Sequence, residues 1–182
     1  MSKFIVASDI HGSFTGVGTL LERFSDEKAD RLILLGDLYY HGPRNPLPAE
    51  YDAQKTADLL NSVKETLIVV RGNCDADVDL CISDFTFSDH YIIPAFGKNL
   101  FFTHGHIYSP YRLPPLLKKG DIFFSGHTHI PMLRNEDGIF LVNPGSIGLP
   151  KGGSQKSYIS VCDEGITLKA LSGDTIASLD FN

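Results

Sequence analysis

Three short apolar runs alternate with two helical patterns in the first half of the chain, and this order limits the folds open to it. The runs are Lys3–Ser8, Arg31–Gly36 and Thr66–Arg71, and the segments between them carry apolar residues at helical spacing over Gly16–Glu27 and Ala53–Glu65. Such an order predicts buried parallel strands joined by right-handed helical crossovers. We therefore expect an α/β fold.

Short strand-like runs fill the second half. They extend over Thr86–Ile93, Asn99–Thr103, Asp121–Ser125, Pro131–Arg134, Ile139–Val142, Ser157–Cys162, Thr167–Leu171 and Thr175–Asp180. The turns Glu136-Asp137-Gly138 and Asp163-Glu164-Gly165 predict hairpins, so this half is expected to be rich in antiparallel strands. Two packed sheets with helices outside them would accommodate both halves. The 182 residues show no linker or repeat, and we expect one domain over residues 1–182.

Composition narrows the class of partner. Sixteen Lys and Arg against 22 Asp and Glu give a net charge of −6, which argues against an extended nucleic-acid surface or an anionic membrane. No apolar stretch approaches the roughly 18 residues of a transmembrane helix, and the first residues lack the long apolar run of a signal peptide. The cysteines Cys74, Cys81 and Cys162 show no CxxC spacing, so we expect a reducing, cytoplasmic location.

Polar motifs follow the predicted strands. They are Asp9-Ile10-His11-Gly12, Gly36-Asp37, Gly72-Asn73-Cys74-Asp75, Thr103-His104-Gly105-His106, Gly126-His127-Thr128-His129 and Asn143-Pro144-Gly145-Ser146. Ligands of open α/β sheets bind outside the carboxyl ends of the strands, so these side chains could converge at one rim. Two carboxylates, one amide and four imidazoles make a ligand set for two borderline divalent ions such as Mn²⁺, Fe²⁺ or Zn²⁺.

As an ordered set, these motifs resemble the calcineurin-like metallophosphoesterase family over about residues 3–150: D-x-H, G-D-x-x-x-H-G, R-G-N-x-D, T-H-G-H, G-H-T-H and N-P-G-S. Within the family, the chain is similar to the small bacterial and archaeal phosphodiesterases of the YfcE type. The resemblance implies the metallo-dependent phosphatase fold, a four-layer α/β/β/α sandwich of two mixed β-sheets flanked by helices. It also implies that the site binds two divalent ions, with Mn²⁺ preferred to Zn²⁺, Fe²⁺ or Ni²⁺. The assembly that it implies is a homodimer or homotetramer.

The resemblance also implies roles for single residues. The first metal would be held by Asp9, His11 and His129, the second by Asn73, His104 and His127, and Asp37 would bridge the two. A hydroxide shared by two ions about 4 Å apart would attack phosphorus directly, without a phospho-enzyme. Asn73 could in addition donate a hydrogen bond to the developing charge, and Asp75 could orient a neighbouring group.

Cys74 departs from the family pattern, because many members carry a histidine there that is thought to protonate the leaving oxygen. A thiol with a reference pKa of about 8.5 is a weaker acid and donor. We therefore expect modest catalysis and a preference for good leaving groups. His41, Arg44 and His106 are candidate substitutes. Arg44 could instead bind phosphate or be a surface charge, and His41 could serve only to fix its loop.

The function expected on these grounds is a metal-dependent phosphodiesterase (EC 3.1.4.-) acting on a small phosphodiester. A phosphomonoesterase or protein phosphatase using the same metals is the first alternative. A non-catalytic protein-binding scaffold is the second, since the family includes a retromer subunit with degraded ligands. All seven ligand positions hold competent residues in this chain, which disfavours the scaffold.

Overall fold

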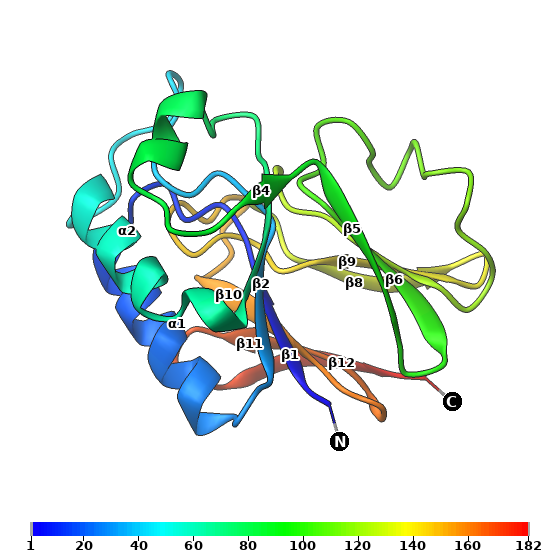
Figure 1. Cartoon of the computed structure of the whole chain (residues 1–182). Coiled ribbons are helices and arrows are strands. Elements are labelled where there is room, and N and C mark those ends of the chain that lie inside the picture. The colour runs from blue at the N-terminus through cyan, green and yellow to red at the C-terminus, as the bar shows by residue number, and fades with distance from the viewer. Residues whose placement is uncertain (1, 182) are drawn as a thin grey trace.

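The computed structural model describes residues 2–181. Its strands form a seven-stranded and a five-stranded sheet that pack face to face, and the two α-helices lie on the outer face of the larger sheet (Figure 1). The expected α/β class with two mixed sheets is confirmed. Within the described residues, no helix is long and apolar enough to cross a membrane.

The larger sheet contains the three buried runs of the first half as parallel neighbours. Its order is β12-β11-β10-β1-β2-β3-β4. The parallel strands are β1 (Phe4–Ala7), β2 (Arg31–Leu34), β3 (Leu67–Val70) and β4 (Phe87–Ser88). The antiparallel strands are β10 (Ser157–Val161), β11 (Gly165–Ala170) and β12 (Thr175–Asp180).

Helices α1 (Phe14–Asp26) and α2 (Ala53–Ser62) make the crossovers between these parallel strands. Helix α2 begins at an Asp52 cap, whose carboxylate accepts a hydrogen bond from the Lys55 N–H at 2.9 Å. It ends earlier than its apolar pattern suggests, and a 3₁₀ turn, η1 (Lys64–Thr66), completes the segment. A second 3₁₀ turn, η2 (Asp77–Cys81), follows β3.

The smaller sheet has a parallel centre, which the sequence pattern does not predict. Its strands are β5 (His90–Ala95), β6 (Lys98–Thr103), β7 (Ile122–Phe124), β8 (Met132–Glu136) and β9 (Ile139–Asn143), in the order β5-β6-β7-β9-β8. Strands β6, β7 and β9 are mutually parallel, and only the edges β5 and β8 are antiparallel. The segment 104–121 between β6 and β7 exceeds the dozen residues that a parallel crossover needs. The carboxyl ends of β6 and β7 therefore share one rim.

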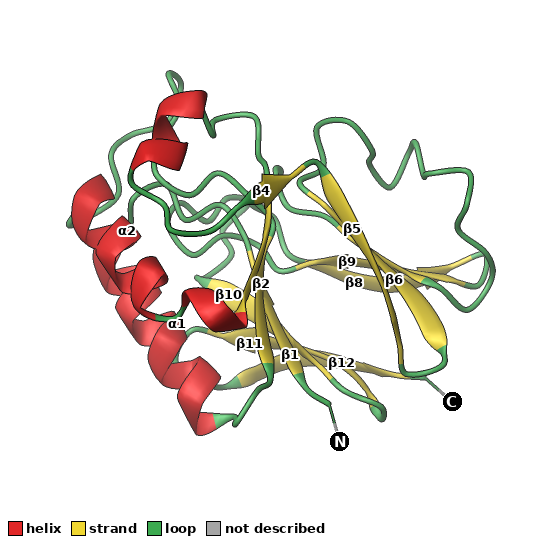
Figure 2. Ribbon diagram, viewed as in Figure 1, coloured by secondary structure: helices red, strands yellow, loops and turns green. Residues whose placement is uncertain are grey.

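Alternation along each strand divides the core. In β1, Phe4 and Val6 face the second sheet, whereas Ile5 and Ala7 face the helices. The outer face of the smaller sheet, which includes Phe101, is covered by the irregular segment 104–121 instead of by helix (Figure 2). The layer of helix expected on this side is thus replaced by loop.

Candidate metal centre

The loops after β1, β2, β3, β6 and β7 bring all seven predicted ligand side chains into one cluster. Asp9, His11 and His129 form its first group. The distance from Asp9 Oδ1 is 3.4 Å to His129 Nε2 and 3.8 Å to His11 Nε2, and the two Nε2 atoms are 3.3 Å apart. All three residues are buried, and their ligand atoms lie within 4.8 Å of one another.

The second group consists of Asn73, His104 and His127. The Asn73 Oδ1 atom lies 2.9 Å from His104 Nε2, and His127 Nδ1 lies 3.2 Å from the same nitrogen. An amide oxygen and two imidazole nitrogens thus face one another.

Asp37 stands between the two groups. Its Oδ2 atom is 3.7 Å from His11 Nε2 in the first group and 3.4 Å from His104 Nε2 in the second. Its Oδ1 atom accepts a hydrogen bond from the Cys74 N–H at 2.8 Å, which fixes the plane of the carboxylate. One carboxylate oxygen is therefore shared by both groups.

Backbone carbonyls orient three of the imidazoles. The Nδ1 atoms of His11, His104 and His129 lie 2.6, 2.7 and 2.6 Å from the carbonyl oxygens of Tyr40, Leu35 and Leu149. A carbonyl only accepts, so Nδ1–H donates and the lone pair of Nε2 is free to face the cluster. This is the tautomer that a metal ligand requires.

The cluster contains a buried carboxylate oxygen and imidazole nitrogens that a bound cation would stabilise. Asp9 Oδ1 is buried and has no hydrogen-bond partner among residues 2–181, and burial raises the pKa of Asp9 to about 7. Burial also lowers the pKa of His129 to about 4. Burial of His104 acts the same way, but the neighbouring Asp37 carboxylate outweighs it and raises the His104 pKa to about 9. His104 is therefore protonated in the metal-free protein, and an ion bound at its Nε2 atom would displace that proton. Divalent ions would also satisfy the orphaned Asp9 oxygen and the lone pairs of the neutral imidazoles, and we identify a buried His/Asp metal-binding site.

Five of the cluster residues adopt left-handed backbone conformations. The φ angles are positive at Asp9 (53°), His11 (49°), Asp37 (56°), His127 (68°) and His129 (60°). Non-glycine residues visit this region rarely, and such strain persists only where the surroundings hold it. Its concentration at these five positions marks the rim as a site built at the expense of local stability.

Buried polar side chains hold these strained loops. Asp75 accepts hydrogen bonds from the N–H groups of Asp37, Leu38 and Gly72 at 2.7–2.8 Å. Ser146 donates to the Asp9 carbonyl at 2.6 Å. Asn143 donates to the Gly126 carbonyl and to Thr128 Oγ1, inside the loop that carries both C-terminal histidines. The N-P-G-S motif thus supports the site without entering it.

A cleft of about 760 Å³ opens over the cluster. Its lining consists of Asp37, Tyr40, Gly42, Pro43, Arg44, Asn45, Asn73, Cys74, His127, His129 and Lys151. His41 does not line it, because its ring packs edge-on against Tyr40 and Tyr51, with centroids 4.8 and 5.9 Å away. Sequence reasoning assigned no role to Tyr40 or Lys151. The one signal for Lys151 is its position two residues after Leu149, whose carbonyl orients His129.

Cys74 meets the cleft as a neutral thiol. Burial and the nearby Asp37 carboxylate raise the pKa of Cys74 to about 12. Its Sγ atom accepts a hydrogen bond from Asn73 Nδ2 at 3.3 Å. The thiol is therefore protonated at neutral pH and is not a nucleophile there.

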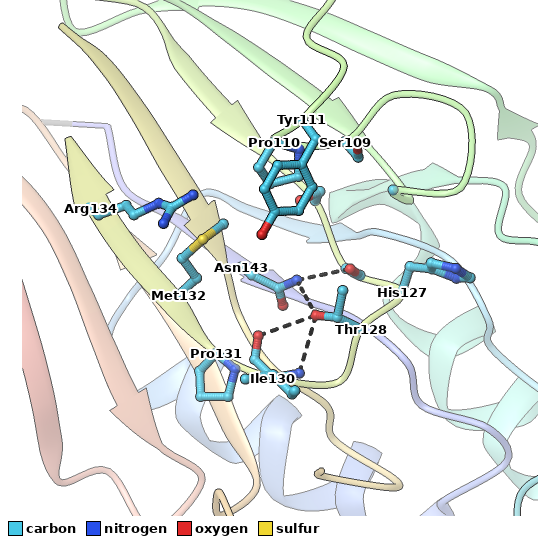
Figure 3. Close-up of a pocket in the computed structure, with 13 residues that line it drawn as sticks. Ser109, Pro110, Tyr111, His127, Thr128, Ile130, Pro131, Met132, Arg134 and Asn143 are labelled. Atoms are coloured by element: carbon cyan, nitrogen blue, oxygen red, sulfur yellow. Dashed lines mark hydrogen bonds between the residues drawn. The ribbon is translucent and has the colours of Figure 1, made fainter. Parts of the chain in front are cut away.

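A separate apolar pocket of about 420 Å³ lies behind the loop that carries His127. Figure 3 shows Pro110, Tyr111, Met132 and Arg134 around it, while the His127 ring points away from these residues. The ligand atoms of the cluster therefore face the polar cleft and not this pocket.

The chain is similar to known proteins in sequence and in fold. The family model for the calcineurin-like phosphoesterase superfamily domain matches residues 2–163. Phosphodiesterase YfcE of Escherichia coli K12 is 41% identical over 177 residues, which cover 97% of this chain and 96% of YfcE. Probable metallophosphoesterase YsnB of Bacillus subtilis is 28% identical over 85% of this chain and 80% of YsnB.

Solved structures agree with this relationship. The structure of the E. coli phosphoesterase YfcE superposes with a TM-score of 0.95 at 39% identity, over 99% of this chain and all of that one. Vps29 of Entamoeba histolytica, solved with Zn²⁺, gives a TM-score of 0.63 at 20% identity over 99% of both chains, which shows a shared fold. Because the family model matches residues 2–163 and YfcE is 41% identical over 97% of the chain, this chain belongs to the calcineurin-like phosphoesterase superfamily.

Proposed function

We propose that this chain is a metal-dependent phosphodiesterase that holds two divalent ions, with Mn²⁺ as the working metal. The observation that carries the proposal is the position of Asp37 Oδ2 within 3.7 Å of ligand nitrogens from both groups. The similarity to phosphodiesterase YfcE supports the choice of reaction.

In this proposal, the first group (Asp9, His11, His129) holds one ion, the second (Asn73, His104, His127) holds the other, and Asp37 bridges them. Bound ions of this kind lower the pKa of a water molecule and polarise a phosphoryl oxygen for in-line attack. The chain supplies the rest. The three carbonyls behind the imidazoles direct Nε2 toward the ions, and the strained loops keep the seven ligand atoms in place before substrate arrives.

The residues around the cluster then act on the substrate. The Asn73 amide N–H, next to its own ligand oxygen, would donate to the negative charge that develops on the phosphoryl oxygens. Cys74 would face the same side as a weak neutral donor, whereas Asp75 would position Asp37 through its backbone. Arg44 would bind an anionic oxygen of the substrate from the cleft wall. His41 does not line the cleft, and we assign it only to holding the loop.

The preference for diesters rests on the similarity to phosphodiesterase YfcE, and the nature of position 74 adds a preference for good leaving groups. A neutral thiol whose pKa is about 12 protonates a leaving alkoxide poorly. Aryl esters, which leave as weakly basic phenolates, are therefore the favoured substrates.

The test compares bis-p-nitrophenyl phosphate with p-nitrophenyl phosphate on protein stripped with a chelator and reloaded with Mn²⁺. We expect faster hydrolysis of the diester and its loss when the metal is withheld. Faster hydrolysis of the monoester would favour the phosphatase alternative. Loaded protein that cleaves neither ester would favour the scaffold.

We also propose that the chain forms a homodimer or homotetramer. Tyr111 and Ile130, which are 94% and 48% exposed, line the same apolar pocket, and a second copy of the chain could cover this patch. Light scattering coupled to size exclusion tests this, with a single monomer mass as the contradicting result.

A further inference from the structure

We infer that Arg44 and Lys151 form a subsite for a second anionic group, so that the substrate is a phosphodiester in which one ester arm carries its own carboxylate or phosphate. This inference rests on the proposed function and names its substrate class. It starts from two cations in the wall of the metal cleft.

Neither cation is neutralised by the protein. Among residues 2–181, no carboxylate lies within 4.0 Å of the Arg44 guanidinium or the Lys151 ammonium. The described residues that line the cleft include one carboxylate, Asp37, and its two oxygens are occupied by the Cys74 N–H and the imidazoles. Both positive charges are therefore available to a ligand.

The backbone directs both side chains to the site. The Lys151 N–H donates to the His129 carbonyl at 3.1 Å, so Lys151 is tied to a cluster residue. The Ser154 hydroxyl donates to the Lys151 carbonyl at 2.7 Å and closes that turn. On the other loop, the Asn45 amide donates to the His41 carbonyl at 2.9 Å and closes the turn that contains Arg44. Both cations therefore project from closed turns and not from free tails.

By a formal charge count, the scissile group is already balanced without these two cations. Two divalent ions contribute +4, and the carboxylates Asp9 and Asp37 contribute −2. A deprotonated attacking water and a singly charged diester contribute −2 more, which brings the centre to zero. Arg44 and Lys151 then leave +2 in a cleft of about 760 Å³, which has room for more than one phosphate group. A second anion on the substrate would restore neutrality, with bidentate binding available from Arg44.

The test is the binding of phosphonates to Mn²⁺-loaded protein by calorimetry. A phosphonate can turn its arm toward either side of the cleft, so the result does not depend on which ester arm leaves. The probes are phosphonoacetate, 3-phosphonopropionate and 4-phosphonobutanoate, each against the alkylphosphonate of equal length. Propane-1,3-bisphosphonate distinguishes a phosphate-like from a carboxylate arm.

We expect one of the probes that carry a second anionic group to bind about tenfold to a hundredfold more tightly than its alkyl control. Charge-assisted hydrogen bonds would give a difference of this size. Arg44→Gln and Lys151→Gln should each reduce this ratio, and the double variant should bring it to about one. Lys119→Gln, an exposed lysine outside the cleft, should keep it. Higher salt should weaken it.

The inference would be overturned if every probe with a second anionic group bound no more tightly than its alkyl control. It would also be overturned if the affinity ratio between probe and control survived in the double variant. Both results are distinct from failure of the proposed function, which shows as absent hydrolysis of bis-p-nitrophenyl phosphate by the loaded wild type.

Discussion

Asp75→Asn should loosen the bridging position of the site from a distance. The Asp75 side chain is buried, and Oδ2 accepts the N–H groups of Asp37 (2.8 Å) and Gly72 (2.7 Å), while Oδ1 accepts that of Leu38 (2.8 Å). Asparagine has nearly the same shape, but its NH₂ group cannot accept a hydrogen bond. At best it retains the two bonds on one oxygen and turns a donor toward the Leu38 N–H.

The cost follows from that count. One hydrogen bond to a charged acceptor is lost and one buried N–H is left without a partner, so we expect a loss of about 2–4 kcal/mol in the free energy of unfolding. The bond that is lost holds the Leu38 N–H, directly after Asp37 in the same strained turn, so we expect Asp37 to shift with it. Affinity for metal should therefore fall together with stability.

Urea unfolding of the metal-free protein measures the first effect, and calorimetric titration with Mn²⁺ measures the second. Asp77→Asn is the matched control, because Asp77 is exposed and pairs only with the exposed Arg71. A loss below about 1 kcal/mol for Asp75→Asn, or wild-type metal affinity, would refute the clamp role.

Three further changes test other parts of the structure. Cys74→His should raise kcat on bis-p-nitrophenyl phosphate and widen the range of leaving groups, since imidazole is a better acid than a thiol whose pKa is about 12; unchanged or lower turnover at full metal content would count against this. Ser146→Ala should lower Mn²⁺ affinity and destabilise by about 1–3 kcal/mol, because Ser146 ties the Asp9 carbonyl to the Leu149 N–H; unfolding and titration curves identical to wild type would contradict it.

The third change, Glu27→Gln, concerns pH. Burial acts to raise the pKa of Glu27, but hydrogen bonds from Tyr158, Lys169 and Ser160 hold it below its usual value. A carboxyl whose folded pKa is depressed stabilises the protein above its unfolded pKa of about 4.3 and loses that contribution as pH falls through the folded pKa. The stability gap between wild type and variant should therefore shrink below about pH 4. A gap independent of pH from 7 to 3 would be inconsistent with this linkage.

The sequence predicts the first half of the fold well because its strands are buried on both faces. Runs such as Leu32–Leu35 are apolar at every position, and segments with helical periodicity separate them. The parallel centre of the second sheet is not predictable in this way. A short apolar run such as the one around Phe123 does not indicate whether its strand is parallel or antiparallel to its neighbour. The length of the connecting segment 104–121 is the feature that favours the parallel arrangement.

The site divides along similar lines. Parallel strand order predicts that Asp9, Asp37 and Asn73 share one rim. The place of His104, His127 and His129 beside them depends on the parallel centre of the second sheet, and the sequence indicates their role only through the family resemblance of the ordered motifs. Lys151 carries no such signal, since its place in the cleft depends on a tertiary hydrogen bond to the His129 carbonyl. His41 shows the converse. It lies in a motif, but its ring packs against Tyr40 and Tyr51 and does not line the cleft.

Titration of metal-free protein with Mn²⁺ tests the central claim most directly, because the account requires two ions that share Asp37. We expect two equivalents per chain for the wild type. Asp37→Asn should weaken both binding steps, while Asp9→Asn should weaken only one strongly. A single equivalent in the wild type, or two steps that Asp37→Asn leaves unchanged, would contradict the binuclear centre.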